Sequence, residues 1–179
     1  MSYIAGHFAM QRQIHVFFTN DHRRLETILE RATAVPEAYD MNAYGEFRSG
    51  LLKHIKMEET ILLPFAQKAR GGEPLPIAAR IRLDHGAITA LMVPPPSPVI
   101  IGALRAILAK HDALEEGAGG MYEALDNLAE NEIEEVMRRI RATPDVPLHP
   151  HKSEPFILDA TRRALERAGY NLSDYEPTG

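Results

Sequence analysis

The sequence lacks cysteine and tryptophan, and it has no long apolar run. Without cysteine, its 179 residues exclude a disulfide framework, a thiolate zinc site, an iron–sulfur cluster and a thiol nucleophile. No apolar stretch reaches the roughly 18 residues of a membrane-spanning helix, and polar side chains interrupt the N-terminal segment 1–18, which does not resemble a signal peptide. We therefore expect a soluble, cytoplasmic protein without a membrane partner.

Basic side chains are also fewer than acidic ones. The chain has 20 basic and 25 acidic side chains, a formal net charge of −5, so it offers no general electrostatic attraction for nucleic acid. Its hydrophobic content of 45% is that of a globular protein rather than a disordered one. The length favours a single domain with a sizeable core.

Alternating β-branched residues are scarce, whereas apolar residues recur at helical spacing. The predicted helical segments are 9–33, 41–69, 76–92, 98–128, 131–142 and 155–168. Four long helices with short connections predict an all-α protein, an up-down-up-down four-helix bundle with short extra C-terminal helices. We expect the bundle over 1–142 and a proline-rich tail over 143–179, whose short helix packs on the bundle.

One hexad occurs twice. The sequence HIKMEE at 54–59 recurs as HDALEE at 111–116, on the second and fourth predicted long helices. These helices run parallel in such a bundle, so the hexads can lie at the same height. Within each hexad, the histidine and the glutamate four residues later are about 40° apart around the helix and face one direction. The following glutamates, Glu59 and Glu116, point about 140° away, which indicates a role behind the site or at an interface.

The core-facing stripes of all four long helices are apolar, except near their middles. There a histidine, or a histidine with a glutamate, interrupts each stripe. An unpaired buried carboxylate costs several kcal/mol, and a cation would compensate for it. The candidate metal ligands are His22, His54, Glu58, His85, His111 and Glu115.

Imidazoles with carboxylates suit iron or manganese better than calcium or magnesium. If both glutamates bridged two metals, each metal would receive two histidines and two carboxylate oxygens. A bridging oxide or hydroxide would add one donor and leave a position open for a small molecule. The alternative is a polar bundle core in which the glutamates and histidines satisfy one another.

Other metal and catalytic patterns are missing. The chain contains no Glu-x-x-His of the ferritin-like di-iron proteins and no HExxH zinc motif. No nucleophile-elbow pattern supports a catalytic serine.

The order of a lone histidine, HxxxE, a second lone histidine and HxxxE resembles the hemerythrin-like, or HHE cation-binding, domain family. The matching stretches are Asp21–Arg23, His54–Glu59, Asp84–Gly86 and His111–Glu116, and the resemblance covers about residues 10–142. It implies a hemerythrin-type bundle with two non-haem iron ions, iron being preferred to manganese. By this resemblance His22 and His54 hold one iron, His85 and His111 hold the other, and Glu58 and Glu115 bridge them.

Two differences set the chain apart from the oxygen-carrying hemerythrins. These have two histidines four residues apart on the third helix, whereas Ile81 and Thr89 flank His85 at that spacing. Their last helix has an aspartate five residues after its histidine, whereas here Glu115 follows His111 by four. The resemblance therefore implies the wider group, and we expect a protein that binds or senses oxygen or a related small oxidant. The alternatives are a di-iron enzyme that consumes peroxide or nitric oxide, and an iron-handling protein.

Three glycines in the segment 117–120 follow the second hexad inside the predicted helix 98–128. Each lowers helix stability by roughly 1 kcal/mol relative to alanine. We expect them to open a path to the metals or to admit a close helix contact; a local break is the alternative. Tyr122 is interpreted as a core residue, and packing or loop roles are preferred for the remaining histidines, which are His7, His15, His149 and His151.

Overall fold

The computed structural model describes residues 12–36 and 38–176, and within them every regular element is helical. The elements are α2 (Gln13–Ala32), α3 (Met41–Met57), the π-helical turn η1 (Glu58–Leu62), α4 (Leu63–Ala69), α5 (Ala78–Leu91), α6 (Pro98–Glu116), α7 (Met121–Leu128), α8 (Ile133–Arg141), α9 (Pro155–Arg167) and the 3-10 turn η2 (Leu172–Tyr175). The expected all-α class is confirmed for this part of the chain. None of its helices combines the length and apolar composition needed to cross a membrane.

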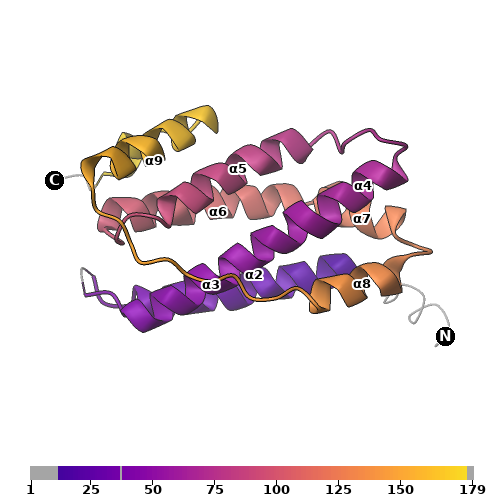
Figure 1. Ribbon diagram of the computed structural model, residues 1–179, viewed down its shortest axis with the longest axis horizontal. Coiled ribbons are helices and arrows are strands. Elements are labelled where there is room, and N and C mark those ends of the chain that lie inside the picture. Colours follow the sequence, from indigo (N-terminus) through magenta and orange to yellow (C-terminus); the bar gives the residue numbers. More distant parts are fainter. Residues whose placement is uncertain (1–11, 37, 177–179) are drawn as a thin grey trace.

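Four long helical segments lie side by side (Figure 1). They are α2, the continuous run α3–η1–α4, α5, and α6 with α7. Helix α2 packs against α3 and α7, and α5 packs against α6. In the C-terminal segment, α9 packs on α5 and η2 packs on α6.

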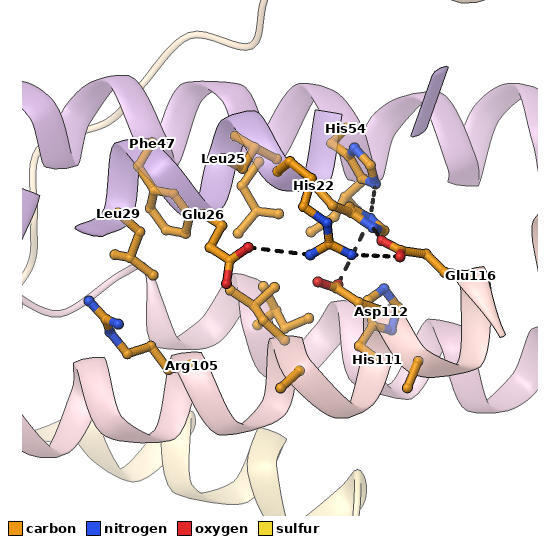
Figure 2. Close-up of a pocket in the computed structure, with 17 residues that line it drawn as sticks. His22, Leu25, Glu26, Leu29, Phe47, His54, Arg105, His111, Asp112 and Glu116 are labelled. Carbon is orange, nitrogen blue, oxygen red and sulfur yellow. Dashed lines mark hydrogen bonds and ion pairs between the residues drawn. The ribbon is translucent and has the colours of Figure 1, made fainter. Parts of the chain in front are cut away.

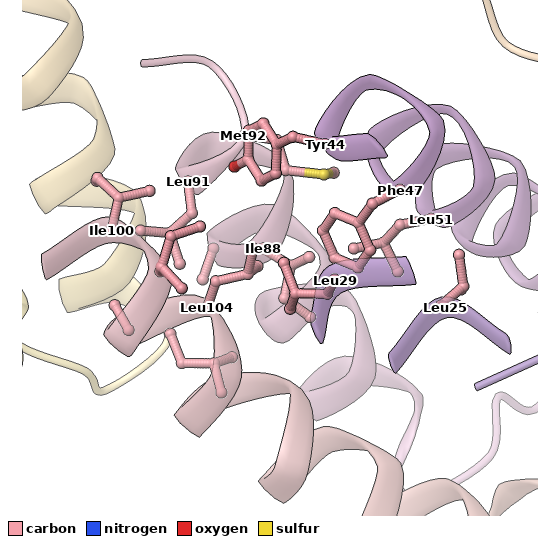
Figure 3. Packing of buried hydrophobic residues seen from close by; sticks show 14 of the residues in the cluster. Leu25, Leu29, Tyr44, Phe47, Leu51, Ile88, Leu91, Met92, Ile100 and Leu104 are labelled. Atoms are coloured by element: carbon pink, nitrogen blue, oxygen red, sulfur yellow. The ribbon is translucent and has the colours of Figure 1, made fainter. Parts of the chain in front are cut away.

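Two apolar clusters fill the interior, one toward each end of the long helices. The first joins α2, α3, α5 and α6 around Leu29, Phe47 and Leu104, and Figure 3 shows these side chains facing one another. The second joins η1, α4, α7 and α8 with the first part of α2. The buried histidines and glutamates lie between these two apolar clusters. They are His22 on α2, His54 and Glu58 in the first hexad, His85 on α5, and His111 and Glu115 in the second hexad. The polar site is therefore enclosed by apolar packing on both sides.

The predicted continuous helix 98–128 is wrong, because the chain breaks between α6 and α7. Gly119 has φ of 74°, a left-handed conformation that favours glycine. A Cβ on Gly120 would lie 2.6 Å from the carbonyl oxygen of Glu115 and 2.7 Å from that of Gly117. Ala118, which a continuous helix would place seven residues after His111 and on the same face, is exposed. The glycines thus form a tight turn, which agrees with the alternative interpretation of this segment as a local break in the helix.

We expect Gly120→Ala to lower the free energy of unfolding by about 2 kcal/mol or more, because its methyl group would meet backbone oxygens that cannot move away easily. The matched control is Gly86→Ala on α5, where a Cβ has open space. That change should stabilise the helix by about 0.5–1 kcal/mol. Urea unfolding of both variants measures the difference, and equal effects would contradict this account of the turn.

The predicted helix 41–69 is continuous but contains the π turn η1. Pro64, which has no N–H to donate, lies in the first turn of α4, directly after this π turn. In the π turn the N–H of Leu63 bonds to the carbonyl of Glu58, five residues earlier. π turns inside α-helices are frequent at functional sites, and this one begins at a predicted ligand.

The chain after α8 is held against α3. The Arg48 guanidinium donates to the His149 carbonyl at 3.2 Å and lies 3.3 Å from His151 Nε2. The ring of His151 also stacks on Tyr44 at 5.8 Å. His151 therefore has a packing role, whereas His149, which is exposed, contributes only its backbone carbonyl. His7 and the start of the predicted helix 9–33 lie outside the described residues.

Candidate metal centre

The six predicted ligands come together in the middle of the molecule. Each is at most 5% exposed, although four of them are histidines and two are glutamates. They come from four different segments: His22 from α2, His54 and Glu58 from α3 and η1, His85 from α5, and His111 and Glu115 from α6.

One half of the cluster is built on His22 and His54. Their Nε2 atoms are 2.9 Å apart. Glu58 Oε1 lies 3.3 Å from His54 Nε2, and Glu115 Oε2 lies 3.4 Å from His22 Nε2. The four residues offer ligand atoms that are all within 4.8 Å of one another.

The other half uses the remaining oxygens of the same glutamates. Glu58 Oε2 is 3.1 Å from His85 Nε2, and Glu115 Oε1 is 3.1 Å from His111 Nε2. These four residues form a second group within the same 4.8 Å limit. Each glutamate therefore directs one oxygen into each half.

These separations suit two donors on one ion. Atoms that each lie about 2.1 Å from a metal, at right angles to one another, are about 3 Å apart. Glu58 Oε2, Glu115 Oε1 and His85 Nε2 are buried and form no hydrogen bond among the described residues. Buried polar atoms are normally hydrogen-bonded, so their convergence without hydrogen bonds fits a cation better than mutual pairing. Imidazole with carboxylate is a donor set of iron and manganese sites.

The outward nitrogen of each histidine faces a carboxylate from another helix. The Nδ1 contacts are His22 to Glu116 at 2.6 Å, His54 to Asp21 at 2.9 Å, His85 to Glu59 at 2.6 Å and His111 to Asp84 at 3.7 Å. A carboxylate at Nδ1 keeps the proton there and leaves the Nε2 lone pair for a metal. Glu59 and Glu116 thus lie behind the site, as their direction on the helix predicts. Asp21 and Asp84 were not predicted, although each directly precedes a candidate histidine.

The C-terminal segment supports one of these carboxylates. The Tyr170 hydroxyl donates to Asp84 Oδ1 at 3.0 Å, and Arg80 pairs with the same carboxylate. Arg80 also donates to the Ala168 carbonyl at 2.8 Å. The segment that follows α9 therefore helps to orient the aspartate behind His111.

The electrostatics of the cluster favour protonated histidines when no other cation is present. Burial lowers the pKa of the His54 imidazole, but Glu58 and Asp21 outweigh it and raise this pKa to about 10. Burial raises the pKa of the Glu58 carboxyl, but His54 and His85 hold it well below its usual range. Because the Nε2 atoms of His22 and His54 are 2.9 Å apart, only one proton fits between them.

Tyr122 is buried in the core, as predicted, but its hydroxyl also belongs to the polar cluster, which was not predicted. Its hydroxyl lies 2.6 Å from Glu58 Oε1 and 2.8 Å from Glu115 Oε2, and donates to these carboxylates. Burial and both carboxylates raise the pKa of this phenol well above 10, so it keeps its proton. Its position seven residues after Glu115 was the only sequence feature that indicated this role. The direction of its side chain could not be derived from that spacing, because it depends on the turn at Gly120.

A cavity of about 460 Å³ leads to the cluster between α2 and α6. Apolar side chains such as Leu29 and Phe47 line one part, and His22 and His54 lie at the other (Figure 2). None of the residues 117–120 lines it, so the expected path through the glycine segment is wrong for this cavity.

His15 lies beside the centre but outside the candidate ligand groups. Its Nε2 is 3.0 Å from the carbonyl oxygen of Glu116, and its ring packs edge-on against Tyr122 at 6.2 Å. Packing therefore accounts for this histidine.

No family model, curated protein or solved structure matched the chain in the three comparisons.

Proposed function

We propose that the chain is a hemerythrin-like protein whose up-down-up-down four-helix bundle holds two iron ions. One observation carries this proposal. Glu58 and Glu115 each direct one carboxylate oxygen to the His22–His54 pair and the other oxygen to the His85–His111 pair. One ion would be held by His22 and His54, and the other by His85 and His111, with both glutamates shared. Manganese is the second candidate metal for the same donors.

The surrounding residues support this assignment. Each Nε2 faces inward because a carboxylate lies at or near the opposite nitrogen of the ring. Two negative glutamates compensate part of the charge of two cations in a buried site. Two histidines and two carboxylate oxygens per ion leave room for an external molecule.

We propose that the protein binds or senses oxygen or a related small oxidant at this centre. Iron bound by these histidines and glutamates would supply the exchange of electrons with such a molecule. The chain itself provides a buried site between two apolar clusters and a cavity that leads to it. These features suit a small molecule that must reach buried metal.

A second candidate function is the consumption of peroxide or nitric oxide, and Tyr122 favours it. Its hydroxyl proton lies beside Glu58 Oε1, inside the cluster. Reduction of either molecule takes up protons, and a neutral phenol at this point can donate one. The binder and the enzyme thus use the same centre and differ in whether the oxidant is released or consumed.

The test is to load the full chain with ferrous iron without oxygen and then add oxygen or peroxide. We expect a change in the visible spectrum that His54→Ala reduces strongly, whereas Glu26→Gln at the cavity mouth does not. Reversal of the change when oxygen is removed would favour the binder, and repeated consumption of peroxide would favour the enzyme. A chain that binds the iron but reacts with neither molecule would contradict both.

A further inference from the structure

The two halves of the cluster are not equal in their polar groups. The hexads align His54 with His111 and Glu58 with Glu115, but they also align Ile55 with Asp112. The repeat therefore places a carboxylate in the second hexad where the first has an apolar side chain.

The Asp112 carboxylate lies on the side of His22. Its Oδ1 is 3.9 Å from His22 Nε2, the atom that faces the cluster (Figure 2). Two donors that each lie about 2.1 Å from one ion can be up to about 4.2 Å apart, so the distance to His22 is within range. Asp112 forms a candidate ligand group with His22 and Glu116 but is not part of the group of His22, His54, Glu58 and Glu115. Its side chain must therefore turn further inward to reach an ion held by His22 and His54. The Asp112 side chain is 25% exposed, lines the cavity and makes no hydrogen bond within residues 12–36 and 38–176.

The other carboxylates near the histidines are already engaged. Glu116 bonds to His22 Nδ1 and to Arg23, and Glu59 bonds to His85 Nδ1 and to Arg82. Asp112, in contrast, has its oxygens free to approach a cation. In the described part of the chain, the group around His85 and His111 contains no donor residue besides Glu58 and Glu115.

We propose that Asp112 is a further ligand of the ion held by His22 and His54, which makes the two metal positions unequal. This inference rests on the proposed two-ion centre. The His22–His54 position has one more oxygen donor than the His85–His111 position, so it binds a divalent ion more tightly and fills first. Glu58 Oε2 and Glu115 Oε1, which are buried without hydrogen bonds, independently point to a cation in the neighbouring His85–His111 half of the centre.

Titration of the metal-free full chain with Co²⁺, followed by its visible absorption, tests the proposal. We expect two binding steps in the wild type, and Asp112→Asn should weaken the tighter step at least tenfold while the other stays within twofold. Single-site backgrounds assign the steps. Asp112→Asn should weaken the ion that remains in His85→Ala and leave the ion that remains in His22→Ala unchanged.

Glu26→Gln is the matched control, because Glu26 lines the same cavity but belongs to no candidate ligand group. It should leave both steps unchanged, and Asp112→Glu should restore most of the affinity. Unchanged binding in Asp112→Asn, or an equal loss in both backgrounds, would overturn the inference and leave the two-ion centre intact. Failure of the wild type to bind cobalt would overturn the proposed function itself.

Discussion

Glu58→Gln is expected to remove both metal ions from the chain at once. Glu58 gives Oε1 to the His22–His54 half and Oε2 to the His85–His111 half. A glutamine has one oxygen and no negative charge, so each position loses a carboxylate donor. In contrast, His54→Ala removes a donor from one half only.

The measurement is metal content per chain after dialysis against a weak chelator. We expect Glu58→Gln to fall from about two ions per chain to nearly none, and His54→Ala to retain about one. Glu46→Gln, an exposed carboxylate on α3 that pairs with Arg31, is the matched control and should keep both ions. If Glu58→Gln and His54→Ala lose the same single ion, the glutamate is not shared between the halves.

The metal-free protein is expected to lose stability between about pH 6.5 and pH 10. The pKa of His54 is raised from 6.5 to about 10 by Glu58 and Asp21, against the effect of burial. A raised pKa in the folded state adds stability that is complete below the unfolded value and is lost as pH rises through the folded value. One pKa unit corresponds to about 1.4 kcal/mol, so His54 alone contributes about 5 kcal/mol as an upper bound.

The opposite change is expected on the acid side. The pKa of Glu58 lies well below its ordinary value of 4.5, so its contribution is present above that value and is lost as pH falls through the lower, folded pKa. Together the two groups predict a stability maximum of the metal-free chain between about pH 4.5 and pH 6.5.

Bound metal should prevent the loss of stability that the metal-free protein shows as the pH rises above about 6.5. A metal takes the Nε2 lone pairs, so binding must release the protons that the histidines hold. Urea unfolding at pH 6 and pH 9, with chelator and with bound metal, measures the difference. Calorimetry of metal binding in two buffers of different ionisation enthalpy measures the protons released. Metal-free stability that is equal at both pH values, or binding without proton release, would contradict the account.

The stripes of the second and third long helices could be read from the sequence because helical spacing is regular. In the predicted helix 76–92, the residues three and four apart that form one face are all buried: Ala78, Ile81, His85, Ile88 and Met92. The same holds for Phe47, His54 and Glu58 on the second helix. One HxxxE pair lies on the second helix, the other lies on α6, and the lone His22 and His85 lie on α2 and α5. Helical spacing alone placed each of them on a core-facing stripe, which is why all six candidate ligands could be named.

Other parts of the site depend on how the helices are rotated against one another. The partner of His54 Nδ1 is Asp21 on α2, and no spacing within one helix indicates such a contact. The turn at Gly120 shifts the register of α7, so the direction of Tyr122 could not be read from the stripe of α6. The cavity between α2 and α6 likewise arises from tertiary packing.

Metal content of the full chain, purified without added metal and recorded with its optical spectrum, tests the central claim most directly. The account predicts about two irons per chain, with absorption from a pair of ferric ions, and loss of one iron in His54→Ala and one in His111→Ala. A chain that holds no metal, even after loading with ferrous iron in the absence of oxygen, would show that the buried histidines and glutamates only satisfy one another.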